Sequence, residues 1–345
     1  MSVRVGIIGA GVMGADHARI IAEHVPGPEL CVVCDASEER ARVVGEANGA
    51  GDIMTDPTAT IARSDVDAVL IASPDETHAD LTLAALEAGK PVLCEKPLAP
   101  SSKDCLRVIE AETRIGKQLI QTGFMRRFDA AYVEMKSALD SGTLGRAVMM
   151  HNFHRNVEAP EWFTGQMAIS NSAPHEFDIA RFVLGTEYAV ITAFQGASDG
   201  PIAPVFMVLE TTQGQLVSIE INNNAAYGYD VRGELVGKKG SVDLGAPVYA
   251  KYNVGLRSAE RFAEDWRPRF ADAYRRQNKA WIQSIEAERP NQNAANAWDG
   301  YCATITAEAG VVALTSGARA KVDTADMPAL YSGQGAEKTW EGAAQ

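Results

Sequence analysis

At 345 residues the chain is long enough for two domains, because a single hydrophobic core stops growing at roughly 250 to 300 residues. Its formal net charge of −13 argues against a nucleic-acid partner, since such binding depends on Lys and Arg neutralising phosphates. No stretch approaches the ~20 apolar residues that cross a bilayer, and the N-terminus lacks a signal-peptide pattern, so we expect a cytoplasmic protein without a membrane partner.

The first predicted element is a strand over residues 3–8, followed by the glycine-rich sequence GAGVMG and a helix. In such a turn Gly9 permits the tight bend, Gly11 lets the backbone approach a pyrophosphate, and Gly14 lets the helix pack closely on the strand. The helix N-terminus adds free N–H groups and a partial positive charge. We therefore predict a dinucleotide-binding loop made of Gly9, Ala10, Gly11, Val12, Met13 and Gly14.

A second apolar run ends at Asp35, which lies 21 residues after Gly14. A carboxylate at this place accepts hydrogen bonds from both adenosine ribose hydroxyls and repels a 2′-phosphate. The next residues, Ala36 and Ser37, include no arginine that would bind that phosphate. We therefore predict NAD as the cofactor, in preference to NADP.

Strands and helices continue to alternate, with further strands expected near 68–72, 91–94 and 118–124. This alternation predicts a parallel sheet with right-handed crossovers, and ligands lie beyond the carboxyl ends of such strands. The other residues predicted to contact the cofactor are Ser73, Pro74, Thr77, His78, Glu95, Lys96 and Gln121.

Lys96 follows the strand at 91–94 in the sequence CEKPLAP. Because Pro97 disfavours the helical region for the residue before it, Lys96 is expected in extended geometry at the strand's end. A lysine there can donate to a substrate oxygen and stabilise developing negative charge. The structural alternative is a lysine that pairs with Glu95.

The pattern changes in the second half of the chain. Strands suited to an antiparallel sheet are expected near 147–155, 188–196, 204–211, 215–222, 229–237 and 240–244. Helices are expected near 129–141, 171–184, 270–287 and 297–316. The predicted fold class is α/β, with an NAD-binding Rossmann domain over 1–125 and a substrate-binding and oligomerisation domain over 126–345 whose large open sheet is mainly antiparallel.

Histidines in this half are candidates for proton transfer, since their pKa lies near neutral pH. His175 stands near the start of the helix at 171–184, one turn before Asp178. We expect His151 and His154, which flank Phe153, to share one face of a strand. Cys31 and Cys34 have the spacing of a zinc or redox half-site, but they lie inside an apolar run. The five cysteines are expected to be reduced and buried, so we predict no metal.

These motifs together resemble the glucose-fructose oxidoreductase, inositol dehydrogenase and rhizopine catabolism (Gfo/Idh/MocA) family, and most closely its NAD-dependent myo-inositol 2-dehydrogenase branch. The resemblance covers nearly the whole chain. It rests on GAGVMG with Asp35, SPDETH at 73–78, CEKPLA at 94–99, QTGFMRRFD at 121–129, HEFDIARF at 175–182, YGYDVRGELVG at 227–237 and AWDGY at 297–301.

The resemblance implies oxidation of a ring secondary alcohol by a homo-oligomer, a tetramer or dimer, with hydride passing to NAD. By motif position Lys96 and His175 match the family's catalytic lysine and histidine. The inositol branch usually has aspartate four residues before that histidine, and this chain has Asn171. Further candidates for binding substrate hydroxyls are Arg126, Arg127, Asn152, His154 and Tyr229.

Asn171 leaves the substrate open, because an amide binds a hydroxyl but cannot take its proton. We therefore expect an inositol dehydrogenase and retain two alternatives. One is a sugar or glycoside dehydrogenase of the same family. The other is a non-catalytic NAD-binding sensor or regulator, since one fold can host either role.

Overall fold

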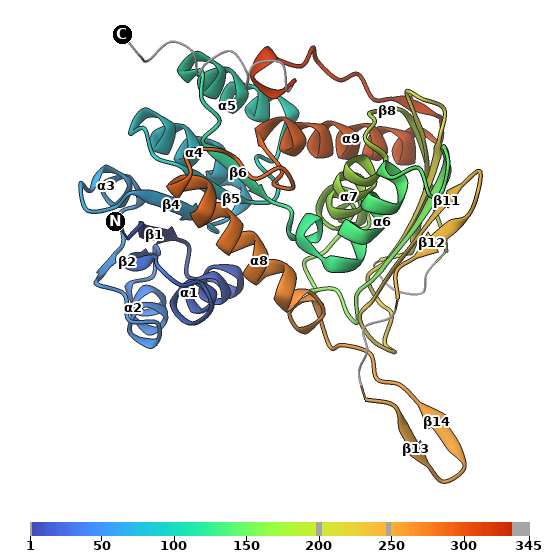
Figure 1. The fold of residues 1–345 in the computed structure, drawn as a ribbon, viewed down its shortest axis with the longest axis horizontal. Helices are drawn as coiled ribbons and strands as arrows, with labels where there is room; N and C mark the ends of the chain where they lie inside the picture. The colour runs from blue at the N-terminus through green and yellow to red at the C-terminus, as the bar shows by residue number, and fades with distance from the viewer. Residues whose placement is uncertain (1, 198–201, 246–249, 333–345) are drawn as a thin grey trace. The chain divides into compact units, whose positions relative to one another are not determined.

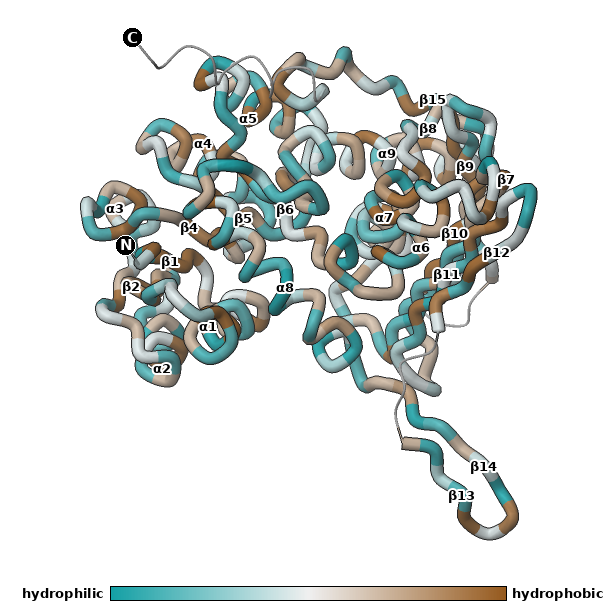
Figure 2. Tube along the Cα trace, in the orientation of Figure 1, coloured by the Kyte–Doolittle hydropathy of each residue, from teal (hydrophilic) through white to brown (hydrophobic). Residues whose placement is uncertain are grey.

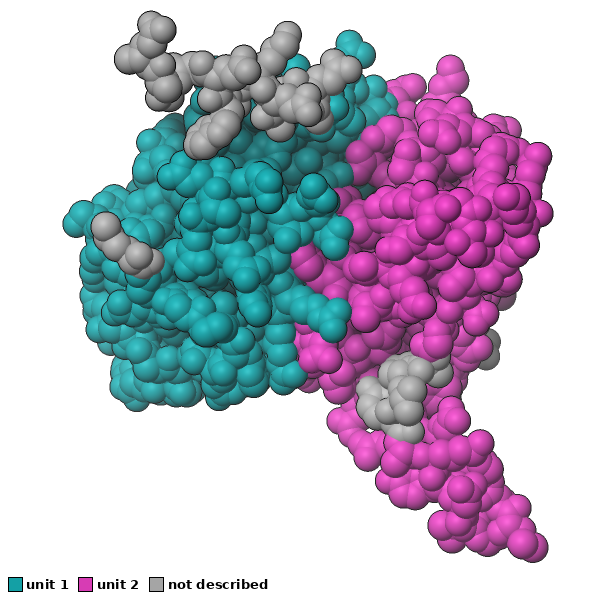
Figure 3. All heavy atoms as spheres, viewed as in Figure 1, with its two compact units in different colours: residues 1–125, 274–304, 324–345 teal, residues 126–273, 305–323 magenta. Residues whose placement is uncertain are grey.

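The computed structural model describes residues 2–197, 202–245 and 250–332, and it divides the chain into two compact units (Figures 1 and 3). Unit 1 contains the described residues of Met1–Met125, Tyr274–Thr304 and Thr324–Gln345; unit 2 contains those of Arg126–Ala273 and Ile305–Asp323. The predicted second domain over 126–345 is therefore too long, because two of its segments pack with unit 1. Its last residues, 333–345, lie outside the described residues. Among the described helices, none has both the length and the hydrophobicity to span a membrane.

Unit 1 is built on a six-stranded parallel sheet in the order β3-β2-β1-β4-β5-β6, which confirms the predicted parallel sheet. Its strands are β1 (Arg4–Ile8), β2 (Glu29–Cys34), β3 (Asp52–Met54), β4 (Ala68–Ile71), β5 (Val92–Glu95) and β6 (Ile120–Gly123). The intervening helices are α1 (Val12–His24), α2 (Glu38–Ala47), α3 (Pro57–Ala62), α4 (His78–Glu87) and α5 (Ser102–Ile115). Every residue of β4 is buried, as expected for a parallel strand covered on both faces.

Helix boundaries in unit 1 follow from the residues beside them. Ser37 begins α2 by accepting a hydrogen bond from the Arg40 N–H, and Asp56 begins α3 in the same way, with Pro57 in its first turn. Gly116 ends α5 in the left-handed conformation, with φ of 75°. These local signals fix where each helix starts and stops.

Later segments of the chain complete unit 1. The part of α8 (Trp266–Glu286) from Tyr274 onward brings Asn278 against His17 of α1, with 3.0 Å between Asn278 Nδ2 and His17 Nδ1. In β6 the Thr122 N–H donates to the Ala295 carbonyl at 2.8 Å. Local sequence patterns predicted these helices but could not reveal which strands they meet.

Glu112 of α5 joins three parts of unit 1. Its buried carboxyl accepts hydrogen bonds from the Leu119 and Ile120 N–H groups at 2.6 and 2.7 Å and from the Tyr331 hydroxyl. Burial raises the pKa of Glu112 to about 7, although these donors oppose the shift. The carboxyl thus titrates near neutral pH at the contact between Tyr331 and the start of β6.

Unit 2 contains a seven-stranded sheet in the order β12-β11-β7-β10-β9-β8-β15. Only β7 and β10 are parallel to each other among its pairs of neighbours, so the prediction of a mainly antiparallel sheet is confirmed. Its strands are β7 (Ala147–Arg155), β8 (Tyr188–Gln195), β9 (Val205–Thr211), β10 (Leu216–Asn222), β11 (Asp230–Gly237), β12 (Ser241–Asp243) and β15 (Ala320–Lys321). Its helices include α6 (Ala130–Asp140), α7 (Pro174–Leu184) and the later part of α9 (Ala297–Ser316).

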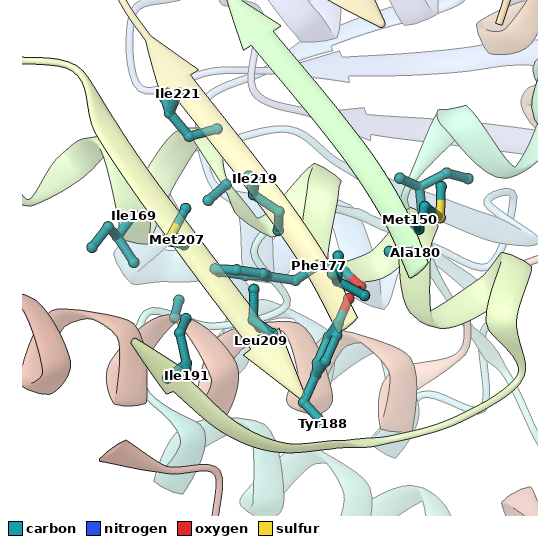
Figure 4. Close-up of a cluster of buried hydrophobic side chains, with 14 of the residues drawn as sticks. Met150, Ile169, Phe177, Ala180, Tyr188, Ile191, Met207, Leu209, Ile219 and Ile221 are labelled. Carbon is teal, nitrogen blue, oxygen red and sulfur yellow. The ribbon is translucent and has the colours of Figure 1, made fainter. Parts of the chain in front are cut away.

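The core of unit 2 lies between this sheet and its helices. The strand register aligns one row of fully buried side chains across five strands: Leu235, Met150, Val217, Leu209 and Ile191. Phe177 of α7 packs against this layer (Figure 4). Along β10 hydrophobic and hydrophilic residues alternate (Figure 2), because side chains on one face are buried in the core and those on the other are partly exposed among the described residues.

A two-stranded hairpin extends from the rest of unit 2 (Figure 1). It consists of β13 (Tyr252–Val254) and β14 (Arg257–Ala259), joined by Gly255 and Leu256, which both have positive φ. Two such residues form the turn that matches the twist of a hairpin. These strands were not predicted, because all of their residues are exposed and show no alternation of buried and exposed positions.

Candidate active site

The glycine loop has the geometry that dinucleotide binding requires. A Cβ at Gly9 would lie 2.4 Å from the Ala72 carbonyl oxygen, and one at Gly14 would lie 1.8 Å from the Gly9 oxygen, so packing demands glycine at both positions. A Cβ at Gly11 would meet no atom within 4 Å. The space beside Gly11, at the start of α1, therefore fits the close approach of a pyrophosphate.

Asp35 is held at the end of β2 by several donors. One carboxylate oxygen accepts from the Ala10 N–H at 2.8 Å, and the other accepts from the Ser37 N–H at 2.8 Å and from the Arg40 guanidinium at 2.7 Å. Partial burial opposes ionisation of Asp35, but these hydrogen bonds outweigh it and lower its pKa. Arg40, in the first turn of α2, was not predicted as a partner of Asp35.

We expect Asp35→Ser to lower the preference for NAD over NADP by roughly 10- to 100-fold, since hydrogen bonds to a charged group contribute about 1.5 to 3 kcal/mol. The substitution removes the predicted ribose acceptor and also leaves the Arg40 guanidinium without its carboxylate, beside the place of a 2′-phosphate. The ratio of the two dissociation constants, measured by titration of each cofactor, checks this result.

The variant Asp35→Ser with Arg40→Ala provides the control, because the gain in NADP affinity should then disappear. If Asp35→Ser binds both cofactors with the wild-type ratio, the assignment of Asp35 to the ribose is wrong.

The loops after β4 and β5 are tied together by His78. This buried ring lies with Nδ1 2.6 Å from the Pro97 carbonyl oxygen and Nε2 2.9 Å from the Ser73 carbonyl oxygen. In the loop after β4 the hydroxyls of Ser73 and Thr77 lie 2.6 Å apart. Both His78 ring nitrogens thus lie within hydrogen-bond distance of backbone carbonyl oxygens, and the ring positions the loop around Lys96. We had predicted that His78 contacts the cofactor.

Gln121 also differs from the prediction. It is buried in β6 and lines a cavity of about 490 Å³ together with Pro91, Gln118 and Trp281. Pro91 and Gln118 precede β5 and β6, so this cavity lies at the amino ends of the strands. The glycine loop lies at the opposite edge, because β1 is parallel to both strands.

Lys96 directly follows β5, at the same edge of the sheet as the glycine loop. Its backbone N–H donates to the Glu95 carboxylate at 3.1 Å, and the Lys96–Pro97 peptide bond is cis. The other Glu95 oxygen lies 2.9 Å from His17 Nε2. His17 was not predicted as a site residue. Its place beside the apolar residues Ala18 and Ile20 of α1 could have indicated a buried histidine.

In unit 2 His175 and Asn171 lie on consecutive helical turns. Asn171 belongs to a short π-helical turn, Ala168–Ser172, and His175 stands in the first turn of α7 after Pro174. The His175 ring centre is 6.5 Å from that of His154 on β7. The turn and the sheet thus bring two predicted site histidines close together.

His151 and His154 do not share a face of β7, contrary to our prediction. Residues three apart in a strand point to opposite sides. His151 bonds to Ser218 at 2.7 Å on the face opposite α7, whereas His154 is buried on the α7 side.

Arg126 and Arg127, which we predicted to bind substrate, each pair with a buried carboxylate. Arg126 is 1% exposed and pairs with the fully buried Glu176, which also lies 3.2 Å from His154 Nδ1. Arg127 pairs with the buried Asp178 at 2.6 Å. Each guanidinium thus pairs with a carboxylate of α7, and the binding of substrate hydroxyls by these two arginines stays a prediction.

The carboxylate of Glu176 is ionised in this pocket. Burial opposes its charge, but the guanidinium of Arg126 and the ring of His154 outweigh that effect and lower the pKa of Glu176. The Tyr229 ring packs edge-on against His154, with ring centres 6.0 Å apart. The contacts of Glu176 with Arg126 and His154 therefore hold the start of α7 in place.

Asn152 lies on the same face of β7 as His154 and is 1% exposed. Within the described ranges, neither polar atom of its side-chain amide has a hydrogen-bond partner. A buried amide in this state usually has a partner that binds separately. Among the predicted substrate residues, Asn152 is thus a candidate that the structure leaves available.

Most of unit 1's first segment and a large part of unit 2 match known protein families. Residues 3–124 match the model described as an oxidoreductase family with an NAD-binding Rossmann fold, and residues 132–243 match the GFO/IDH/MocA C-terminal domain. The chain belongs to the GFO/IDH/MocA oxidoreductase family. The predicted resemblance is confirmed, and the fold is that of an NAD-binding oxidoreductase.

Relatives in the GFO/IDH/MocA family cover nearly the whole chain. Inositol 2-dehydrogenase 2 of Saccharopolyspora erythraea is 46% identical over 96% of this chain and 99% of its own length. Inositol 2-dehydrogenase of Streptomyces avermitilis is 42% identical over 95% of this chain and 96% of its own. The crystal structure of myo-inositol dehydrogenase from Lactobacillus casei with NAD(H) and myo-inositol has a TM-score of 0.92 at 28% identity, covering 96% of this chain and 100% of that one.

Proposed function

We propose that the chain is an NAD-dependent dehydrogenase that oxidises a ring secondary alcohol of a cyclitol to the ketone. Support comes from relatives named inositol 2-dehydrogenase, which match over almost their full length. The observation that carries the proposal is the position of Lys96. It follows β5 at the sheet edge where the glycine loop follows β1 and the Ser73 loop follows β4, and these three strands are neighbours.

In this proposal NAD, when bound, accepts the hydride. A ring nitrogen of His175 takes the proton of the substrate hydroxyl, and Lys96 Nζ donates a hydrogen bond to the same oxygen. Asn171 and Asn152 bind neighbouring hydroxyls, because an amide both donates and accepts. Arg126 and Arg127 act indirectly, by holding the helix that carries His175.

The test measures NADH formation with purified protein and a panel of myo-inositol, scyllo-inositol, chiro-inositol, glucose and methyl glycosides. We expect turnover with at least one inositol and a lower kcat/KM for the sugars. Turnover confined to sugars or glycosides would replace the cyclitol with the first alternative, which Asn171 keeps open. NAD binding without NADH formation from any compound would favour the sensor.

We also propose a cytoplasmic homo-oligomer, a tetramer or dimer, formed through the uncovered face of the seven-stranded sheet. Helices α6, α7 and α9 lie on one side of that sheet (Figure 1). The opposite face carries Phe194, Phe206 and Leu216, which are 57%, 44% and 42% exposed. Phe194 and Phe206 are paired across β8 and β9, so they form a continuous apolar surface.

A further inference from the structure

A buried network links helix α1 to the backbone of Lys96. His17 Nε2 lies 2.9 Å from one Glu95 oxygen, and the Lys96 N–H donates to the other at 3.1 Å. On its far side His17 Nδ1 lies 3.0 Å from the amide nitrogen of Asn278. A ring with its hydrogen on Nε2 donates to Glu95 and accepts from Asn278, so every polar atom in the series His17, Glu95 and Lys96 N has a partner.

The surrounding chain is shaped to hold the Glu95 carboxylate in this place. A Cβ at Gly123 of β6 would lie 2.8 Å from it, so glycine provides the space that the carboxylate fills. The Tyr274 ring packs edge-on against the His17 ring, with ring centres 5.8 Å apart. Because Glu95 and His17 are both buried, neither side chain can leave without breaking a charged hydrogen bond away from water.

The network connects two parts of the site that lie far apart in the sequence, helix α1 and the end of β5. His17 lies one turn beyond Gly14, on the helix whose N-terminus faces the predicted pyrophosphate site. Glu95 is the last residue of β5 and directly precedes Lys96. The side chains of His17 and Glu95 therefore link α1 to the Lys96 backbone.

We propose that His17 and Glu95 are positioning residues that set the orientation of Lys96 for proton transfer and couple it to the cofactor-binding helix. This inference rests on the proposed catalytic role of Lys96. Neither residue is assigned a contact with substrate. Their effect is geometric, and a displacement of about 1 Å in a reacting group can reduce rate by on the order of 10²-fold.

The test compares two substitutions of His17. His17→Leu removes the donor to Glu95, and we expect kcat to fall by roughly 10- to 100-fold while the dissociation constant for NAD changes by less than about threefold. His17→Gln places an amide N–H near the position of Nε2, so it should recover most of the lost kcat. His24→Leu, at the surface end of α1, is the matched control and should behave as wild type.

A double-substitution cycle separates this inference from the proposed function. If His17 acts through Lys96, adding His17→Leu to Lys96→Met should not lower the residual rate further. An unchanged kcat in His17→Leu, equal losses in the Leu and Gln variants, or full additivity with Lys96→Met would overturn the positioning role. Near-wild-type turnover in Lys96→Met alone would instead remove Lys96 from the mechanism, whatever His17 does, and a wild-type protein that forms no NADH with any compound would refute the proposed function.

Discussion

Lys96→Met is expected to lower kcat by roughly 10²- to 10⁴-fold, the range associated with loss of a proton-transfer group. Methionine keeps most of the side chain's length but cannot donate a hydrogen bond or carry charge. The oxygen of the reacting hydroxyl would then develop negative charge without the hydrogen bond that Lys96 Nζ donates in the proposed mechanism. Steady-state kinetics with the best inositol of the panel, together with an NAD titration, checks the expectation that binding of NAD persists.

Lys103→Met is the matched control, since Lys103 is exposed in the first turn of α5 and has no proposed role. It should retain wild-type kcat and KM. A Lys96→Met enzyme that turns over at a near-normal rate would remove Lys96 from the mechanism. A loss of NAD binding equal to the loss of rate would make Lys96 a cofactor-binding residue only.

Arg126→Met is expected to lower the free energy of unfolding by about 3 to 5 kcal/mol at neutral pH, because it leaves the buried Glu176 without its guanidinium partner. In the wild type the lowered pKa of Glu176 contributes stability above the carboxyl's ordinary pKa of about 4.3, and that stability is lost as pH falls through the folded value. In the variant the dominant effect is burial, which raises that pKa. The destabilisation should therefore be smallest near pH 4 to 5 and grow toward pH 8, as measured by urea denaturation at several pH values.

The double variant Arg126→Met with Glu176→Met tests the cause. Replacing both members of a buried ion pair by apolar residues is often nearly neutral, so much of the lost stability should return. Arg42→Met removes the exposed ion pair of Arg42 with Glu39 and should change stability little. A small, pH-independent effect of Arg126→Met would contradict the buried charge pair.

The nucleotide-binding features were predictable because each depends on local chain geometry. Gly9 and Gly14 sit where a side chain would collide with backbone, and Asp35 ends a run of apolar residues. The same is true of the buried strands and of the helix that begins before His175. Such features follow from a few neighbouring residues, so their pattern is visible without the fold.

The contacts that the sequence did not reveal involve partners far along the chain. The partners of Arg126 and Arg127 are Glu176 and Asp178 of α7, about fifty residues later in the chain. Gln121 is in the predicted strand, but the strand direction assigns it to the wrong edge for the cofactor. His151 and His154 were misplaced because the twofold period of the strand was not applied.

Unit 2 is inserted into unit 1, and this order has a consequence for how the protein is made. During synthesis His17 is made early, but its partner Asn278 follows 261 residues later. In the same way, Thr122 of β6 is made long before its partner Ala295. His17 and the β6 backbone at Thr122 therefore remain without these partners while residues 126–273 of unit 2 are synthesised. The sheet whose strands are synthesised first is thus completed only after most of unit 2 has been made.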